Sequence, residues 1–286
     1  MVYRILEVRE ISPKVQRMVI DAPLIAKKHR PGQFVIIINT EQGERIPLTV
    51  ADKDPDKGQI VVIFQEVGKS TTEMACRKAG EELFDVVGPL GKPTHIEKLG
   101  TVVCIGGGVG TAPMHPITRA MKKIGNEVIT ILGARNKDLF TMEEEMTAAS
   151  TEIRFTTDDG SRGRHGFVTD ELQSIIDSGK KIDLVIAIGP AIMMKVVCNL
   201  TRKYELPTVV SLNSIMVDGT GMCGACRVTV GGETKFVCVD GPEFDGHLVD
   251  FDQLMKRQQM YRTEEGIAMD KYREEHPGGC CGGHHE

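Results

Sequence analysis

The first part of the chain alternates apolar and polar residues over short stretches that turn signals separate. Stretches of this kind, rich in β-branched residues, are typical of β-strands. They lie at residues 3–8, 15–20, 33–38, 47–51, 59–64 and 82–87. Turn signals stand at residues 30–32, 54–55 and 88–91, and one helical stretch covers residues 71–78. Six short strands at this spacing predict a small antiparallel barrel over residues 1–97.

The second part changes to continuous apolar runs, which are typical of parallel strands covered on both faces. These runs lie at residues 101–105, 128–132, 184–188 and 208–212, with a further strand expected at 152–156. Helical patterns separate them at residues 112–123, 139–149, 168–178 and 191–203. Strands that alternate with helices predict an α/β domain with a doubly wound parallel sheet over residues 98–216.

The third part is rich in glycine and cysteine and predicts a small module over residues 217–250. Short strands are expected there at residues 227–230 and 235–237. The remaining residues, 251–286, are charged and predict a C-terminal helix followed by a flexible tail with the sequence PGGCCGGHHE.

Composition narrows the possible functions. The 286 residues carry a formal net charge of −5 and contain no large basic block, which disfavours nucleic-acid binding. Neither a secretory leader nor an apolar run long enough to span a membrane is present, so we expect a cytoplasmic protein that does not bind a membrane. The eight cysteines do not form a secreted disulfide framework. Cys76, Cys104 and Cys198 are predicted to be small buried residues.

A first glycine-rich turn, Gly68-Lys-Ser70-Thr71-Thr, lies between a strand and a helix. The Walker pattern requires a glycine where Ile63 stands, and it requires a parallel sheet, so a nucleotide-hydrolysing loop is disfavoured. A helix N-terminus can still bind a pyrophosphate through backbone N–H groups. Taken alone, the turn favours a plain helix cap.

A second glycine-rich turn contains Gly106, Gly107, Gly108, Gly110 and Thr111, and it joins a strand to a helix. Thr111 replaces the third glycine of the dinucleotide fingerprint, and the acidic residue expected about 20 positions later is missing. Glycines crowded at a strand end nevertheless indicate that a ligand approaches the backbone closely.

The strongest local pattern is Asp218-x4-Cys223-x2-Cys226-x11-Cys238. Plant-type [2Fe–2S] sites use C-x4-C-x2-C and a distant fourth cysteine, and here Asp218 stands at the first position. Structural zinc and a redox disulfide between Cys223 and Cys226 are the alternatives. Zinc usually takes four paired Cys or His ligands, and only His247 is near these cysteines in the sequence. The tail could also bind metal through Cys280, Cys281, His284 and His285.

Together these parts resemble the ferredoxin reductase-like superfamily over roughly residues 1–250. Within it, the chain is similar to the electron-transfer subunits of dihydroorotate and sulfide dehydrogenases. It is most similar to the small subunits of NADH-dependent ferredoxin:NADP oxidoreductases, the bifurcating transhydrogenases, because the dihydroorotate type has four cysteines where this chain has Asp218 and three.

The resemblance implies three cofactors: FAD, NAD(H) and one [2Fe–2S] cluster. It implies that Arg45 contacts the FAD phosphates, and that Pro47, Leu48 and Thr49 belong to the flavin-binding strand, with Thr49 facing the ring. It further implies which residues lie around the other parts of the cofactors. Ile63, Phe64 and Gln65 line the adenine or ribitol side, and Gly68, Ser70 and Thr71 cap the pyrophosphate. The turn from Gly106 to Thr111 binds the nicotinamide dinucleotide, and Gly189 and Pro190, with Met193 nearby, close over the nicotinamide. Asp218, Cys223, Cys226 and Cys238 hold the cluster.

The implied function is electron transfer between NAD(H), FAD and the cluster, to or from a larger flavin and iron–sulfur subunit, with ferredoxin as an external acceptor. No catalytic acid–base pair is expected, because the cofactors supply the reactivity. The alternatives are a dihydroorotate or sulfide dehydrogenase subunit and a redox-sensing module without turnover. NAD is favoured over NADP by the resemblance alone, since Arg135, Arg162 and Arg164 fit either a 2′-phosphate or solvent.

Overall fold

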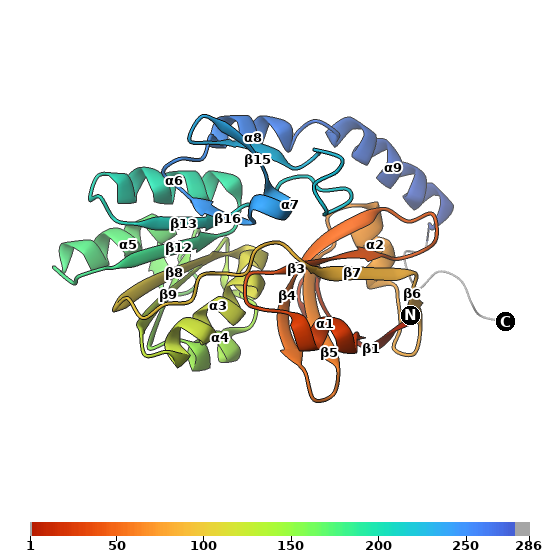
Figure 1. Cartoon of the computed structure of the whole chain (residues 1–286), viewed down its shortest axis with the longest axis horizontal. Helices are drawn as coiled ribbons and strands as arrows, with labels where there is room; N and C mark the ends of the chain where they lie inside the picture. Colours follow the sequence, from red (N-terminus) through yellow and green to blue (C-terminus); the bar gives the residue numbers. More distant parts are fainter. Residues whose placement is uncertain (1, 278–286) are drawn as a thin grey trace.

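Two seven-stranded sheets stand side by side in the computed structural model, which describes residues 2–277, and a smaller C-terminal module lies across both (Figure 1). This arrangement confirms the predicted combination of an antiparallel barrel, an α/β domain and an appended module. No helix of the described part is long and apolar enough to cross a membrane.

The first sheet is antiparallel and has the strand order β6-β1-β2-β5-β4-β3-β7. Its elements are β1 (Tyr3–Ser12), β2 (Val15–Asp21), α1 (Pro23–Lys28), β3 (Phe34–Ile38), β4 (Arg45–Asp54), β5 (Gln59–Gln65), α2 (Lys69–Ala75), β6 (Glu82–Leu83) and β7 (Asp85–Leu90). Ile20, Ile37, Ile60 and Val62 are fully buried inside it, as the alternating pattern requires. The short helix α1 was not predicted.

The strand predicted at residues 82–87 is in fact two strands, and β7 continues through Gly88 and Pro89, which we had assigned to a turn. Proline lacks an N–H donor, but β7 lies at the end of the strand order, where an edge strand can accommodate it. A register shift between Phe34 and Ile36 keeps Leu90 paired with Phe34.

The second sheet has the order β11-β10-β9-β8-β12-β13-β16 and is parallel except at β16. Its strands are β8 (Thr101–Gly107), β9 (Glu127–Ala134), β10 (Glu152–Thr157), β11 (Arg164–His165), β12 (Leu184–Ile188), β13 (Thr208–Ser211) and β16 (Glu243–Asp245). The helical segments are η1 (Gly108–Gly110), α3 (Thr111–Lys123), η2 (Lys137–Leu139), α4 (Glu143–Ala149), α5 (Val168–Asp177) and α6 (Ala191–Arg202). Helices α3 and α4 cover one face, and α5 and α6 cover the other (Figure 1).

The C-terminal module consists of β14 (Arg227–Val230), β15 (Glu233–Phe236), α7 (Val237–Asp240), α8 (Phe251–Arg257) and α9 (Arg262–Glu275). Its residues also supply β16, which pairs with β13 and so extends the second sheet. Helix α8 packs on α6, and α9 reaches back to α2, where Tyr272 is buried with its hydroxyl 3.7 Å from Cys76 Sγ (Figure 1). The expected flexible tail from residue 278, with its possible metal ligands, lies outside the described residues.

Two of the three scattered cysteines occupy the cores, as predicted. Cys104 and Cys198 are buried free thiols, whereas Cys76 is only half-buried, so the prediction for Cys76 is wrong. Cys76 is the C-cap of α2 and so lies at the end of a helix near the surface rather than in a core strand or helix.

Candidate functional site

The loop from Asp218 to Cys226 is wound tightly by glycines. Gly219, Gly221 and Gly224 have φ values of +74°, +88° and +66°, a region that other residues rarely adopt. The Asp218 carboxylate accepts N–H groups from Thr220 at 3.0 Å, Met222 at 3.1 Å and Cys223 at 3.0 Å. The aspartate therefore organises the loop at the position where the related pattern has a cysteine.

The four candidate ligands lie in two pairs. Cys223 Sγ is 3.4 Å from Asp218 Oδ1, and Cys226 Sγ is 3.3 Å from Cys238 Sγ. Within residues 2–277, no three His, Cys, Asp or Glu side chains gather as a single ion would require. A tetrahedral zinc site needs four ligands around one point, whereas a two-iron cluster takes two ligands on each iron. The paired arrangement favours the two-iron centre.

The ionisation of these ligands differs with their surroundings. The backbone N–H of Thr220, followed by the contacts with Cys223, lowers the pKa of Asp218 to about 2, so the carboxylate is available as a hard oxygen ligand. Burial raises the pKa of the Cys238 thiol to about 12. A buried thiol of this kind becomes a thiolate when a metal replaces its proton.

The candidate flavin strand is β4. A strand of the barrel should alternate buried and exposed residues, yet Pro47, Leu48 and Thr49 are all half-buried in succession. Ile46 and Val50 on either side are buried. Leu48 packs on the barrel core, while each of the three consecutive side chains keeps some exposed surface, as a strand beside a bound ligand would.

The turn before α2 lies beside the start of β4. The Thr71 hydroxyl accepts the N–H groups of Val67 at 3.1 Å and Gly68 at 3.2 Å, while Ser70 donates to the carboxylate of Glu44, next to Arg45. This contact joins the predicted pyrophosphate cap to the residue that precedes the predicted phosphate-binding arginine. At the end of β5, Ile63 and Phe64 are buried in the cores and Gln65 is half-buried, so of these three side chains Gln65 has the most exposed surface.

Arg45 connects β4 directly to the loop from Asp218 to Cys226, which carries candidate cluster ligands and is called the cluster loop below. Its Nε donates to the carbonyl oxygen of Val217 at 2.8 Å, immediately before Asp218. A Cβ on Gly219 would stand 2.8 Å from Leu90 and 2.9 Å from Ile36, so the loop backbone packs on β7 and β3 without space for a side chain. The first residue of the candidate flavin strand therefore contacts the loop that carries the candidate cluster ligands, and the neighbouring strands pack on it.

The second glycine-rich turn lies at the carboxyl end of β8. Gly106 and Gly107 end the strand, and Thr111, whose hydroxyl donates to the Gly108 carbonyl at 3.0 Å, begins α3. After β8 the chain builds the sheet outward on one side through β9, β10 and β11, and it then returns to form β12 on the other side of β8. Ligands of doubly wound sheets bind at such a switch point.

Gly189 and Pro190 reach the same place from the end of β12. A Cβ on Gly189 would stand 3.1 Å from Gly107 Cα and 2.8 Å from Met193 Cε, and one on Gly107 would clash with Met193 Sδ. The two segments predicted to hold the nicotinamide dinucleotide are thus brought together, with Met193 between them.

The arginines considered for a 2′-phosphate have different surroundings. Arg162 pairs with Glu143 at 2.5 Å and lies over the Phe155 ring, and Arg164 pairs with Glu171 at 3.1 Å. Arg135 follows β9 and has no ion pair within the described part of the chain.

Two segments of the chain match known protein families. Residues 104–199 match the oxidoreductase NAD-binding domain, and residues 213–250 match the iron–sulfur cluster binding domain of dihydroorotate dehydrogenase B. A dihydroorotate dehydrogenase B (NAD(+)) electron transfer subunit homolog from Thermotoga maritima is 50% identical over 88% of this chain and 89% of its own length. The chain belongs to the family of dihydroorotate dehydrogenase B electron-transfer subunits and their homologues.

A solved structure supports the more specific resemblance. A chain in the structure of the NADH-dependent reduced ferredoxin-NADP oxidoreductase, solved for insights into flavin-based electron bifurcation, is 46% identical with a TM-score of 0.91. The match covers 95% of this chain and 98% of that one. Phthalate dioxygenase reductase, at 13% identity and a TM-score of 0.60, shares the fold.

The four candidate cluster ligands of this electron-transfer subunit fit the group that the family implies. They lie inside the matched segment 213–250, occur as two pairs, and combine three thiols with a carboxylate of lowered pKa. The glycine-rich turns at residues 106–111 and 189–190 lie inside the matched NAD-binding segment.

Two contacts at the site were not predicted from the sequence. Glu44 was not identified as the partner of Ser70, although it adjoins Arg45, and Val217 was not identified as the acceptor of Arg45. Arg45 and Val217 are 172 positions apart, so no local pattern indicates that contact.

Proposed function

We propose that this chain is the electron-transfer subunit of a cytoplasmic NADH-dependent ferredoxin:NADP oxidoreductase, with FAD on β4 and one [2Fe–2S] cluster at residues 218–238. NAD(H) would bind at the turns after β8 and β12. A flavin exchanges electrons in pairs or singly and the cluster carries one electron, so bound together they convert two-electron into one-electron transfer. A larger flavin and iron–sulfur subunit would be the partner, and ferredoxin an external acceptor of the complex.

The observation that carries this proposal is the contact between Arg45 and the cluster loop. The Arg45 Nε–H donates to the Val217 carbonyl and so holds the start of β4 beside Asp218, while the Gly219 backbone packs directly on the side chains of Ile36 and Leu90. These contacts support a close arrangement of the two proposed cofactor sites.

The individual roles proposed here are those that the family resemblance implies. Thr49, Leu48 and Pro47 would line the flavin, and the remaining guanidinium donors of Arg45 would face its phosphates. Gly68, Ser70 and Thr71 would cap the pyrophosphate, with Gln65, Ile63 and Phe64 on the adjoining side.

A dihydroorotate dehydrogenase subunit is the second candidate. The 50% identity to the Thermotoga maritima homolog favours it, and Asp218 in place of a cysteine argues against it. The identity of the larger subunit that purifies with the chain separates the two candidates.

Cofactor analysis of the anaerobically purified chain tests the proposal. We expect one FAD with two iron and two sulfide ions per chain, and an electron paramagnetic resonance signal after reduction. Replacing Cys238 by serine should remove or alter that signal, whereas Cys104→Ser, a control in the sheet core, should keep it. A chain that contains zinc, or flavin without iron, would refute the assignment.

A further inference from the structure

Two arginines hold the cluster loop from outside. Arg227 Nη1 donates to the Gly224 carbonyl at 3.1 Å, and Arg257 Nη2 donates to the Ala225 carbonyl at 3.0 Å. Gly224 and Ala225 are the two residues between Cys223 and Cys226. Both guanidinium groups therefore contact the segment that separates two of the candidate ligands.

These hydrogen bonds fix the orientation of the loop N–H groups. In a trans peptide the C=O and N–H point in opposite directions. With the Gly224 carbonyl turned to Arg227, the Ala225 N–H points the other way and lies 3.5 Å from Cys223 Sγ. Arg257 holds the next peptide plane in the same manner, so the Cys226 N–H is turned away from the arginine.

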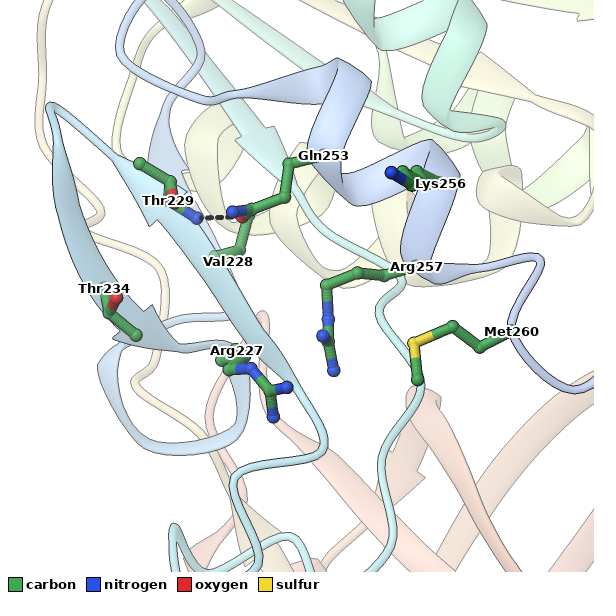
Figure 2. A pocket seen from close by; sticks show the side chains of 8 residues that line it. All are labelled: Arg227, Val228, Thr229, Thr234, Gln253, Lys256, Arg257 and Met260. Atoms are coloured by element: carbon green, nitrogen blue, oxygen red, sulfur yellow. Dashed lines mark hydrogen bonds between the residues drawn. The ribbon is translucent and has the colours of Figure 1, made fainter.

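Helix α8 holds Arg257 in place. Asp250 Oδ1 caps α8 by accepting the Gln253 N–H at 2.9 Å, and Gln253 Oε1 accepts the Thr229 N–H of β14 at 2.9 Å. Leu254 is buried beneath the helix. Figure 2 shows the bond from Gln253 to Thr229 and places Arg257 opposite Arg227. Because α8 begins at Phe251, Arg257 lies outside the segment 213–250 that matches the cluster-binding domain.

Arg227, Lys256 and Arg257 line a cavity of about 340 Å³ that has no acidic residue in its wall (Figure 2). Within residues 2–277, none of the three forms an ion pair, while the two arginines donate to the loop. Positive charge is thus concentrated at the outer side of the cluster loop. Lys256 shares the cavity without a hydrogen bond to the loop, which makes it a matched control.

We propose that Arg257, assisted by Arg227, is a positioning residue that raises the reduction potential of the cluster. The inference rests on the proposed function, since it requires the cluster at residues 218–238. Hydrogen bonds to the sulfur atoms raise the potential of an iron–sulfur centre, and nearby positive charge favours the more negative reduced form. Arg227 fixes the peptide plane whose Ala225 N–H lies against Cys223 Sγ, Arg257 fixes the next plane along, and each adds its own positive charge.

The test is a redox titration of the cluster in the full-length chain, followed by electron paramagnetic resonance. Arg257→Gln should make reduction at least tenfold less favourable, a shift of about 59 mV to lower potential for one electron. Lys256→Gln removes the same charge from the same cavity and should shift the potential by less than half as much. Arg257→Lys should give an intermediate value. Hydrogen exchange at the Ala225 and Cys226 amides should be faster in Arg257→Gln only.

Equal potentials in Arg257→Gln and Lys256→Gln would overturn the proposal. If Arg257→Gln does not retain its cluster, then Arg227→Gln and Arg257→Lys decide: shifted potentials support the proposal, and wild-type potentials in both overturn it. A wild-type chain without any cluster signal would instead refute the proposed function.

Discussion

Single residues at this site act through contacts that sequence spacing does not reveal. The spacing identified Asp218 and the three cysteines as candidate ligands, but not that the Asp218 carboxylate would accept three backbone N–H groups. Nor could it pair Arg45 with Val217, because that contact depends on how the barrel and the module pack. Residue types in a motif indicate chemistry, whereas long-range partners depend on tertiary structure.

Glu243 provides a prediction at this scale. Its carboxyl group accepts the Thr94 hydroxyl at 2.5 Å and is enclosed beside Gly32, although the residue as a whole keeps some exposed surface. Burial raises the pKa of Glu243 from 4.5 to about 7 in the folded chain. Its ionisation therefore disfavours folding: this contribution to stability is complete below pH 4.5, declines as the pH rises, and is lost above 7.

The expected loss is roughly 2–3 kcal/mol between pH 4.5 and pH 8. Urea denaturation at a series of pH values measures this loss as the difference in the free energy of unfolding between the wild type and Glu243→Gln. The variant keeps an acceptor for Thr94 but cannot ionise. Glu233→Gln, which removes an exposed carboxylate paired with Lys235, is the control: it keeps Glu243, so its stability should decline with pH as that of the wild type does. Parallel curves for the wild type and Glu243→Gln would contradict the expectation.

At the scale of elements, the parallel strands were the easiest to predict. β8, β9 and β12 are continuous apolar runs because helices cover both of their faces, and their positions agree with the pattern. α1, β11 and β16 were missed. β16 has three residues and exists as a strand because β13 offers it an unpaired edge, which is a tertiary effect.

The close contact between η1 and the end of β12 gives a prediction at this scale. A Cβ on Gly110 would clash with the Ile188 carbonyl and stand 2.9 Å from Gly189 Cα. Gly110→Ala should therefore force apart the two turns proposed to bind NAD(H), at a cost of about 1–3 kcal/mol in stability. We expect the dissociation constant for NADH to rise about tenfold or more, which corresponds to about 1.4 kcal/mol.

Gly266→Ala is the matched control, because nothing lies within 4 Å of its added Cβ in α9. It should leave NADH binding unchanged and the chain as stable as the wild type or up to about 1 kcal/mol more stable. If Gly110→Ala binds NADH as tightly as Gly266→Ala does, the turn after β8 is not part of the dinucleotide site.

At the scale of the whole molecule, the three candidate sites form a series. The turns after β8 and β12 lie on the second sheet, β4 lies on the barrel, and the cluster loop packs on β3 and β7. α3 connects the first two, since its His115 Nδ1 lies 3.0 Å from the Ala51 carbonyl of β4 and its Arg119 pairs with Asp52 at 2.8 Å. The C-terminal helices extend from the cluster loop to α2 (Figure 1). The sequence predicted these modules but not their mutual contacts.

The most direct test of the central claim is a stepwise anaerobic titration of the isolated chain with NADH, in which flavin absorbance and the cluster signal are recorded together. The account predicts that NADH reduces both centres, with three electrons taken up per chain: two by the flavin and one by the cluster. Two results would contradict the account. One is flavin that NADH leaves oxidised, and the other is a cluster that stays oxidised although the flavin is fully reduced and the reduction potential of the cluster favours transfer.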